Sequence, residues 1–110
     1  MPRLKFKELK GNEWIGEIDY NIELNDGKRH FRLDLIYLRE KYRSKGYGNI
    51  IIKDIIEKAK MLQCSSIIVD LTKEDYDYYS PYEKRKSFFE NFGFKFDKEG
   101  DYAVLNLFKK

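Results

Sequence analysis

Residues 38–48 read Leu-Arg-Glu-Lys-Tyr-Arg-Ser-Lys-Gly-Tyr-Gly, and residues 49–62 continue Asn-Ile-Ile-Ile-Lys-Asp-Ile-Ile-Glu-Lys-Ala-Lys-Met-Leu. In the second part, apolar residues recur at steps of three and four, which predicts an amphipathic helix. In the first part, Gly46 and Gly48 let the backbone turn tightly and approach a ligand closely. The first amides of a helix attract anions such as phosphate, and Arg43 and Lys45 add positive charge. The stretch therefore predicts a phosphate-binding loop. An ordinary strand-to-helix turn is the alternative, because neither the Walker pattern nor G-x-G-x-x-G is present.

A hairpin is expected before this loop. Asp26-Gly27 predicts a two-residue turn between strands at residues 14–24 and 28–38, with Asn25 opposite Lys28. This register gathers apolar or small pairs on one face, namely Ile22–Phe31, Tyr20–Leu33, Ile18–Leu35 and Gly16–Tyr37. It gathers a mostly polar set on the other face, namely Glu23–His30, Asn21–Arg32, Asp19–Asp34 and Glu17–Ile36. Residues 4–9 alternate lysine with apolar residues and predict a further short strand at the sheet edge.

The remaining elements are expected behind the loop. Residues 67–71, Ile-Ile-Val-Asp-Leu, predict a buried strand, and strand, helix and strand in succession predict a parallel crossover. Residues 82–91 predict a second helix that Gly93 ends, and residues 94–96 and 102–108 predict a closing hairpin. The expected order is β-β-β-α-β-α-β-β in one mixed sheet, formed by a single domain over residues 1–110.

Composition narrows the class of protein. The 110 residues carry 22 Lys and Arg against 19 Asp and Glu, and this net charge of +3 is too small to indicate a dedicated nucleic-acid binder. The single cysteine, Cys64, excludes an intrachain disulfide and favours a reducing compartment, so a cytoplasmic protein is expected. No apolar run is long enough for a membrane span, the N-terminal residues do not form a signal peptide, and no metal-ligand spacing is evident. Cys64 is expected to be a small core residue. His30, opposite Glu23, is expected to be a member of a surface pair.

Three segments together resemble one known family. R-x-x-G-x-G at residues 43–48, Ile-Ile-Val-Asp-Leu at 67–71 and Ser-Phe-Phe-Glu-Asn-Phe-Gly-Phe at 87–94 are similar to the GNAT superfamily of acyl-CoA N-acyltransferases, and the likeness extends over about residues 33–108. It implies an α+β fold with a mixed, mostly antiparallel sheet, a parallel β-α-β crossover and a V-shaped splay between two strands. It also implies acetyl-CoA as acyl donor and direct transfer of the acetyl group to an amine.

The resemblance also implies which residues bind the donor. The loop would hold the CoA pyrophosphate through Arg43, Ser44, Lys45, Gly46, Tyr47 and Gly48. The backbone of Tyr37 and Leu38 would pair with the pantetheine arm, and the strand ending near Asp70 would splay away to admit the thioester. Phe89 stands where the family often carries a tyrosine that protonates the leaving thiolate.

The chain departs from the family's pattern at three places. Only 13 residues precede Trp14, which leaves no room for the family's first two helices, so the hairpin's polar face is expected to be open to a bulky acceptor such as a protein, or to a second subunit in a homodimer. Phe89 cannot act as an acid, and Tyr82 or another tyrosine of residues 72–82 would have to replace it. That loop also carries Glu74, Asp75 and Asp77, which would suit a cationic amine, although a solvated loop is the alternative.

The expected general base is a carboxylate on the open face. The register places Asp34 opposite Asp19, and the repulsion between the two carboxylates would raise the pKa of one of them. Asp34, with Asp19 or a water between, would then deprotonate the amine. Glu17 is the second candidate, and a solvated face neutralised by Arg32 is the alternative. A non-catalytic acyl-CoA-binding or protein-interaction module with the same fold is the competing function.

Overall fold

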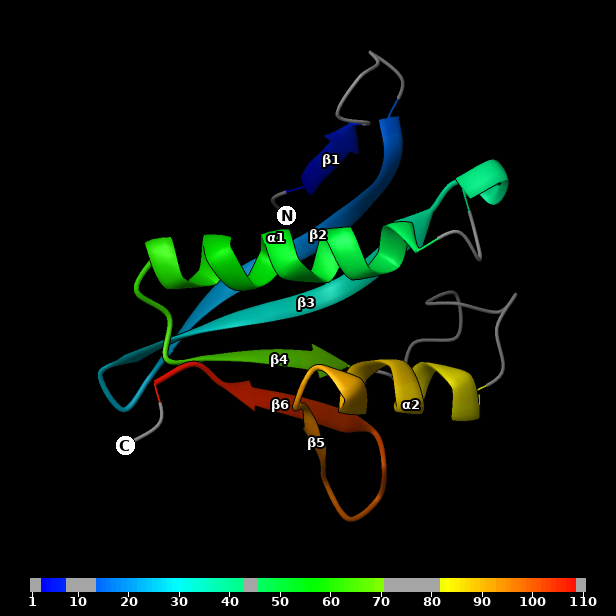
Figure 1. Cartoon of the computed structure of the whole chain (residues 1–110). Helices are drawn as coiled ribbons and strands as arrows, with labels where there is room; N and C mark the ends of the chain where they lie inside the picture. Colours follow the sequence, from blue (N-terminus) through cyan, green and yellow to red (C-terminus); the bar gives the residue numbers. More distant parts are fainter. Residues whose placement is uncertain (1–2, 8–13, 43–45, 71–81, 109–110) are drawn as a thin grey trace.

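The computed structural model describes residues 3–7, 14–42, 46–70 and 82–108 (Figure 1). Its strands are β1 (Arg3–Lys7), β2 (Trp14–Asn25), β3 (Lys28–Leu38), β4 (Ser66–Asp70), β5 (Lys95–Phe96) and β6 (Tyr102–Asn106). Its helices are α1 (Tyr47–Met61) and α2 (Tyr82–Asn91), with a short 3-10 turn, η1 (Glu40–Tyr42), after β3. The predicted order of elements is confirmed, and α2 has the predicted bounds.

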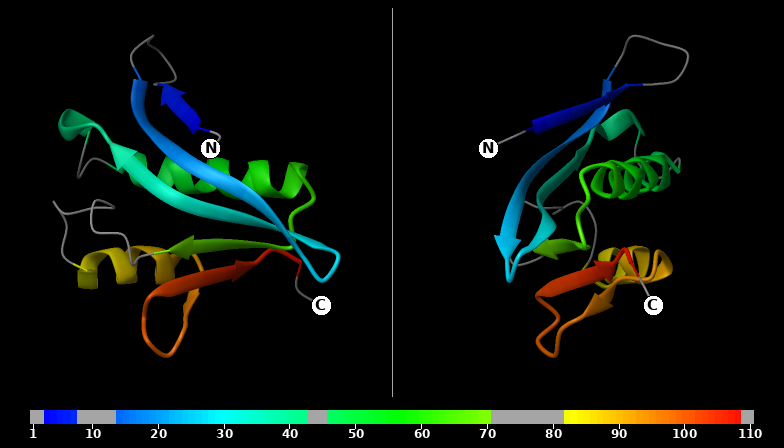
Figure 2. Two further views of the ribbon diagram at one scale, coloured as in Figure 1. Left: turned by 180° about the vertical axis from the view of Figure 1, so that it is seen from behind. Right: turned by 90° about the vertical axis from the view of Figure 1, so that its left-hand side faces the viewer.

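The six strands form one sheet in the order β1-β2-β3-β4-β6-β5. All neighbours are antiparallel except β3 and β4, which are parallel and joined through α1. Both helices cover the same face of this sheet, as the edge-on view of Figure 2 shows. The mixed sheet with one parallel crossover is the predicted fold class. In the described part of the chain, no helix is both long enough and apolar enough to cross a lipid bilayer.

The turn of the β2–β3 hairpin has the predicted chemistry. Asp26 and Gly27 both have positive φ, at 54° and 73°, as a two-residue turn that follows the twist of the strands requires. The predicted register is confirmed from Asn25 opposite Lys28 to Tyr20 opposite Leu33.

Beyond that point the predicted register is wrong, because β3 contains a β-bulge at Asp34. Asp19 lies opposite Leu35 rather than Asp34, and the following pairs are Ile18–Ile36, Glu17–Tyr37 and Gly16–Leu38. An extra residue in one strand reverses the faces of the residues after it. Asp19 and Asp34 are therefore not directly opposed, and Tyr37 lies across from Glu17 instead of Gly16.

The core lies between the sheet and the two helices. Helix α1 buries Ile51, Ile52, Ile55 and Ala59 against strand residues of the same face, including Phe31, Leu33, Ile67 and Val69. Each large side chain that is fully buried stabilises the fold by about 1.5–3 kcal/mol. Cys64 is part of this core with no exposed surface, as predicted.

Two glycines mark the ends of the helices. Gly46 (φ 84°) immediately precedes α1, which begins two residues before the predicted start at Asn49. Gly93 (φ 94°) follows α2, and its amide donates to the carbonyl of Glu90 at 2.9 Å. Positive φ costs a side-chain-bearing residue energy that glycine avoids, which explains why a glycine stands directly before α1 and two residues after the end of α2.

Candidate active site

The parallel pairing of β3 and β4 stops before β3 ends. The last pair is Leu33 opposite Val69, yet β3 continues to Leu38 and β4 ends at Asp70. Figure 1 shows the two strands diverging toward the end of the sheet where both helices begin. We call this divergence the fork, formed by residues 34–38 of β3 and Asp70 of β4. It is the predicted V-shaped splay.

The N-terminus of α1 lies at the same end of the sheet as the fork (Figure 1). The N-cap residue is Gly46, no side chain of the described residues caps this helix, and its first turn contains no acidic residue. The amide of Asn49 donates to the carbonyl of Gly46 at 3.2 Å, which closes the first turn. The positive dipole end of a helix whose first turn carries no acidic residue suits a phosphate group. Arg43, Ser44 and Lys45, also predicted for this role, lie outside the described residues.

An aromatic side chain from α2 packs directly against the start of α1. A Cβ placed on Gly48 would lie 3.4 Å from two ring carbons of Phe88. Phe89, the residue singled out from the sequence, is instead 2 % exposed and packs in the core against Phe88 and Phe94. Of the two adjacent phenylalanines, it is therefore Phe88 that packs against Gly48 of the predicted phosphate loop. Helical periodicity alone could not identify which of two adjacent phenylalanines faces the loop.

The end of β3 is held against β2 on the other side of the fork. The amide of Arg39 donates to the carbonyl of Ile15 at 2.9 Å, and its Nη1 donates to the carbonyl of Trp14 at 3.0 Å. The guanidinium also lies 5.0 Å from the centre of the Trp14 ring, a cation–π contact. Leu38 is buried and Tyr37 is 37 % exposed. The predicted pantetheine-binding segment is thus anchored on its β2 side and ends at the fork.

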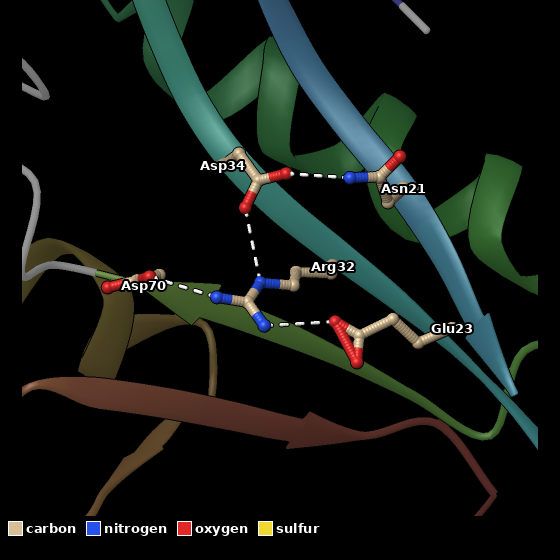
Figure 3. Close-up of polar contacts among 5 residues, drawn as sticks. All are labelled: Asn21, Glu23, Arg32, Asp34 and Asp70. Carbon is tan, nitrogen blue, oxygen red and sulfur yellow. Dashed lines mark hydrogen bonds and ion pairs between the residues drawn. The ribbon is translucent and has the colours of Figure 1, made fainter. Parts of the chain in front are cut away.

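A cluster of charged side chains lies on the face of the sheet that the helices leave uncovered (Figure 3). At its centre Arg32 donates from Nε to Asp34 Oδ1 at 3.1 Å, from Nη2 to Asp70 Oδ2 at 3.1 Å and from Nη1 to Glu23 Oε1 at 2.9 Å. Asn21 Nδ2 donates to the second oxygen of Asp34 at 3.1 Å. Although this face was expected to be solvated, Asp34 and Asp70 are only 5 % and 3 % exposed.

The environment of Arg32 has an electrostatic consequence. The hydrogen bond to Glu23 raises the pKa of Arg32 above its ordinary value, and the charge of Glu23 and the contacts with Asp34 add to the effect against the opposing influence of burial. The guanidinium therefore stays charged at any pH at which proteins fold. Both oxygens of Asp34 accept hydrogen bonds, so Arg32 and Asn21 hold its carboxylate in place. Asp34 does not face Asp19, although the predicted register required it.

The other predicted residues divide into three groups. Glu17 and Asp19 are half-buried on the open face of β2. His30 lies at the opposite end of the sheet from the fork, across from Glu23 as predicted, and its Nδ1 lies 2.7 Å from Ser66 Oγ. Tyr82 begins α2, but its side chain and residues 71–81 lie outside the described part of the chain.

Comparison with known sequences agrees with this architecture. The family model described as "Acetyltransferase (GNAT) family" matches residues 6–94. No curated protein matches the chain.

Comparison with solved structures identifies the same fold. An acetyltransferase from Thermus thermophilus superposes with a TM-score of 0.69 at 22% identity, over 96% of this chain and 64% of that chain. The NatC complex bound to Gag peptide and CoA superposes with a TM-score of 0.68 at 18% identity, over 93% of this chain and 67% of that chain. Arabidopsis thaliana Naa50 in complex with the bisubstrate analogue CoA-Ac-MVNAL superposes with a TM-score of 0.59 at 16% identity, over 83% of this chain and 63% of that chain. The chain thus spans about two thirds of the length of these chains.

Proposed function

Because this chain belongs to the GNAT acetyltransferase family, we propose that it transfers an acetyl group from acetyl-CoA to an amine. The observation that carries the proposal is that the fork and the N-terminus of α1 lie at one end of the sheet. The helix start would hold the CoA pyrophosphate, the backbone of Tyr37 and Leu38 would pair with the pantetheine arm, and the thioester would enter the fork.

The proposed reaction is direct attack. The lone pair of the amine nitrogen forms a bond to the thioester carbonyl carbon, and the carbon–sulfur bond breaks to release CoA as a thiolate. The nitrogen loses a proton to a base, and the thiolate gains one from an acid or from water. Glu17 is the base that the register favours, because it lies directly across from Tyr37 at the fork. Tyr82 stays the proposed acid.

The acceptor that the site suits best is an amine on a polypeptide. Two of the superposed structures are described with a peptide or a peptide-like bisubstrate analogue. In this chain, the sheet face behind the fork is not covered by α1 or α2, so a large acceptor could approach from that side (Figure 2). The cluster of Glu23, Asp34, Asp70 and Arg32 has two more negative charges than positive ones, which favours the approach of a cationic amine.

Calorimetric titration with acetyl-CoA tests the donor site. We expect micromolar binding by the wild type, loss of binding in Gly48→Glu and substantial retention in Gly48→Gln. The two substitutions place side chains of similar size against Phe88, so their difference isolates the repulsion between a carboxylate and the pyrophosphate. Absence of binding by the wild type would contradict the proposed function. Equal losses in the two variants would contradict the placement of the pyrophosphate.

Turnover separates the enzyme from the competing binding module. With a mixture of peptides that carry free N-terminal and lysine amines, we expect CoA release that depends on both the peptide and the acetyl-CoA. Glu17→Gln should lower the rate most at low pH, where the amine is most protonated, and Asp19→Asn is the matched control on the same strand. Binding of acetyl-CoA without CoA release from any amine would favour the non-catalytic module.

A further inference from the structure

The fork begins at two adjacent aspartates. Arg32 lies opposite Ile68 and Leu33 lies opposite Val69, so the next step along both strands reaches Asp34 and Asp70. Asp34 is the bulged residue of β3, and Asp70 is the last residue of β4. Backbone pairing between the two strands therefore ends where two carboxylates would otherwise face each other.

These carboxylates are joined by a third side chain instead. The guanidinium of Arg32 donates to Asp34 and to Asp70 through two different nitrogens, each at 3.1 Å, and Glu23 on β2 accepts from the third at 2.9 Å. Figure 3 shows Arg32 between the two aspartates, so that one planar group spans three neighbouring strands.

Both carboxylates are buried, which strengthens the repulsion between them. Like charges side by side on neighbouring strands are unfavourable, and water screens them poorly when both carboxylates are buried. The positive charge of Arg32 between them offsets this repulsion. The planar, multidentate guanidinium suits this task, whereas the ammonium of a lysine cannot reproduce its geometry.

We propose that Arg32 is a positioning residue that sets how far β3 and β4 diverge, by tying the bulged Asp34 to the end of β4. Because acyl-CoA is proposed to enter this fork, the inference rests on the proposed function for what is positioned there. Arg32 acts through the two strands and need not touch the ligand. Its loss would leave two buried aspartates that repel each other and would widen the fork.

The test compares Arg32→Met with the triple variant Arg32→Met/Asp34→Asn/Asp70→Asn. We expect the single variant to raise the Kd for acetyl-CoA roughly tenfold or more at pH 8, as for loss of a charged hydrogen bond, and the triple variant to recover much of the affinity. At pH 5 the single variant should recover in part, because one aspartate can then take up a proton and hydrogen-bond to the other. A residue with a purely structural role would not produce this dependence on pH.

Other titratable groups face the same cluster and need a control. Glu23 from β2 contacts Arg32 directly, and Glu17 and Asp19 lie further along that strand. His30 lies two residues before Arg32 on β3, and Tyr102 on β6 lies directly across from Asp70. Each of the two variants is therefore compared with the wild type over the same pH range. All three proteins are then measured again in a His30→Gln background. An Arg32→Met profile parallel to that of the wild type, or a triple variant no better than the single one, would overturn the inference.

Hydrogen exchange of the unliganded protein separates this inference from the proposed function. We expect Arg32→Met to speed amide exchange at residues 31–33 and 67–70, and the triple variant to slow it again, with little change in α1. If the wild type does not bind acetyl-CoA, the proposed function fails, and unchanged exchange at the fork would separately refute the role of Arg32. If Arg32→Met does not fold, Arg32→Lys serves in its place and should show a smaller change of the same sign.

Discussion

Replacing Gly16 with alanine tests the packing that supports the proposed donor site. A Cβ on Gly16 would overlap the carbonyl oxygen of Tyr37 and would lie 3.3 Å from the Cα of Leu38 and 3.4 Å from Ile51 Cδ1. The first two neighbours are backbone of the paired strand, so no rotation of a side chain can relieve the overlap. The strands would have to separate locally.

The expected cost follows from that geometry. Forcing one extra methyl group into a well-packed site costs about 1–3 kcal/mol, and for a chain of this length each kcal/mol lowers the melting temperature by about 4 °C. We therefore expect thermal unfolding followed by circular dichroism to show a decrease of about 4–12 °C. Because Tyr37 and Leu38 are displaced, the Kd for acetyl-CoA should rise as well.

Gly48→Ala is the matched control for Gly16→Ala. Among the described residues, its Cβ would meet only the ring of Phe88, at 3.4 Å, and that ring can move. We expect its melting temperature to stay within a few degrees of the wild type, because its free-energy change should be no more than about 0.5 kcal/mol. A Gly16→Ala protein that melts within about one degree of the wild type would refute the close approach of β2 and β3.

Two further predictions concern single residues. Burial raises the pKa of the Cys64 thiol, against a smaller opposite effect of Arg29, so native protein should react slowly with a thiol reagent at pH 8 and unfolded protein rapidly. Because the raised value belongs to the folded state, this contribution to stability is fully present below the thiol pKa of the unfolded chain, about 8.5, and is lost as the pH rises through the folded-state value. Urea unfolding between pH 7 and 10 would show it as a difference between the wild type and Cys64→Ala, and equally fast labelling of native protein would contradict the burial. Gly46→Ala should cost about 1–2 kcal/mol in the same unfolding assay, because φ is 84° and no other described residue lies within 4 Å of the new Cβ, so backbone strain is the expected cause. A smaller cost for Gly46→Asn would support that cause, and an unchanged midpoint in Gly46→Ala would contradict it.

The order of elements could be predicted because each depends on local signals. The three- and four-residue spacing of Ile51, Ile52, Ile55 and Ala59 predicted α1, and Asp26-Gly27 predicted the hairpin. Turn chemistry and side-chain periodicity act over a few residues, so they are visible in a single chain.

The bulge in β3 was not predicted, and its effects extend to the candidate site. Leu35 and Ile36 are both apolar, so alternation alone permits either residue to face Ile18. The structure places Ile36 there, which moves Tyr37 across from Glu17 and leaves Asp34 as the extra residue. The predicted opposition of Asp19 and Asp34 failed for this reason.

The sequence by itself determined the strands, the helices, the hairpin turn and the glycine-bearing start of α1, because periodicity and backbone preference are properties of neighbouring residues. Only the tertiary structure decided that Phe88 rather than Phe89 meets Gly48, and that Arg32 lies between Asp34 and Asp70. Those contacts join residues as many as 40 positions apart (88 minus 48) and depend on how strands and helices meet in space. The charge of each residue was visible in the sequence, but its partners were set by the packing of the sheet.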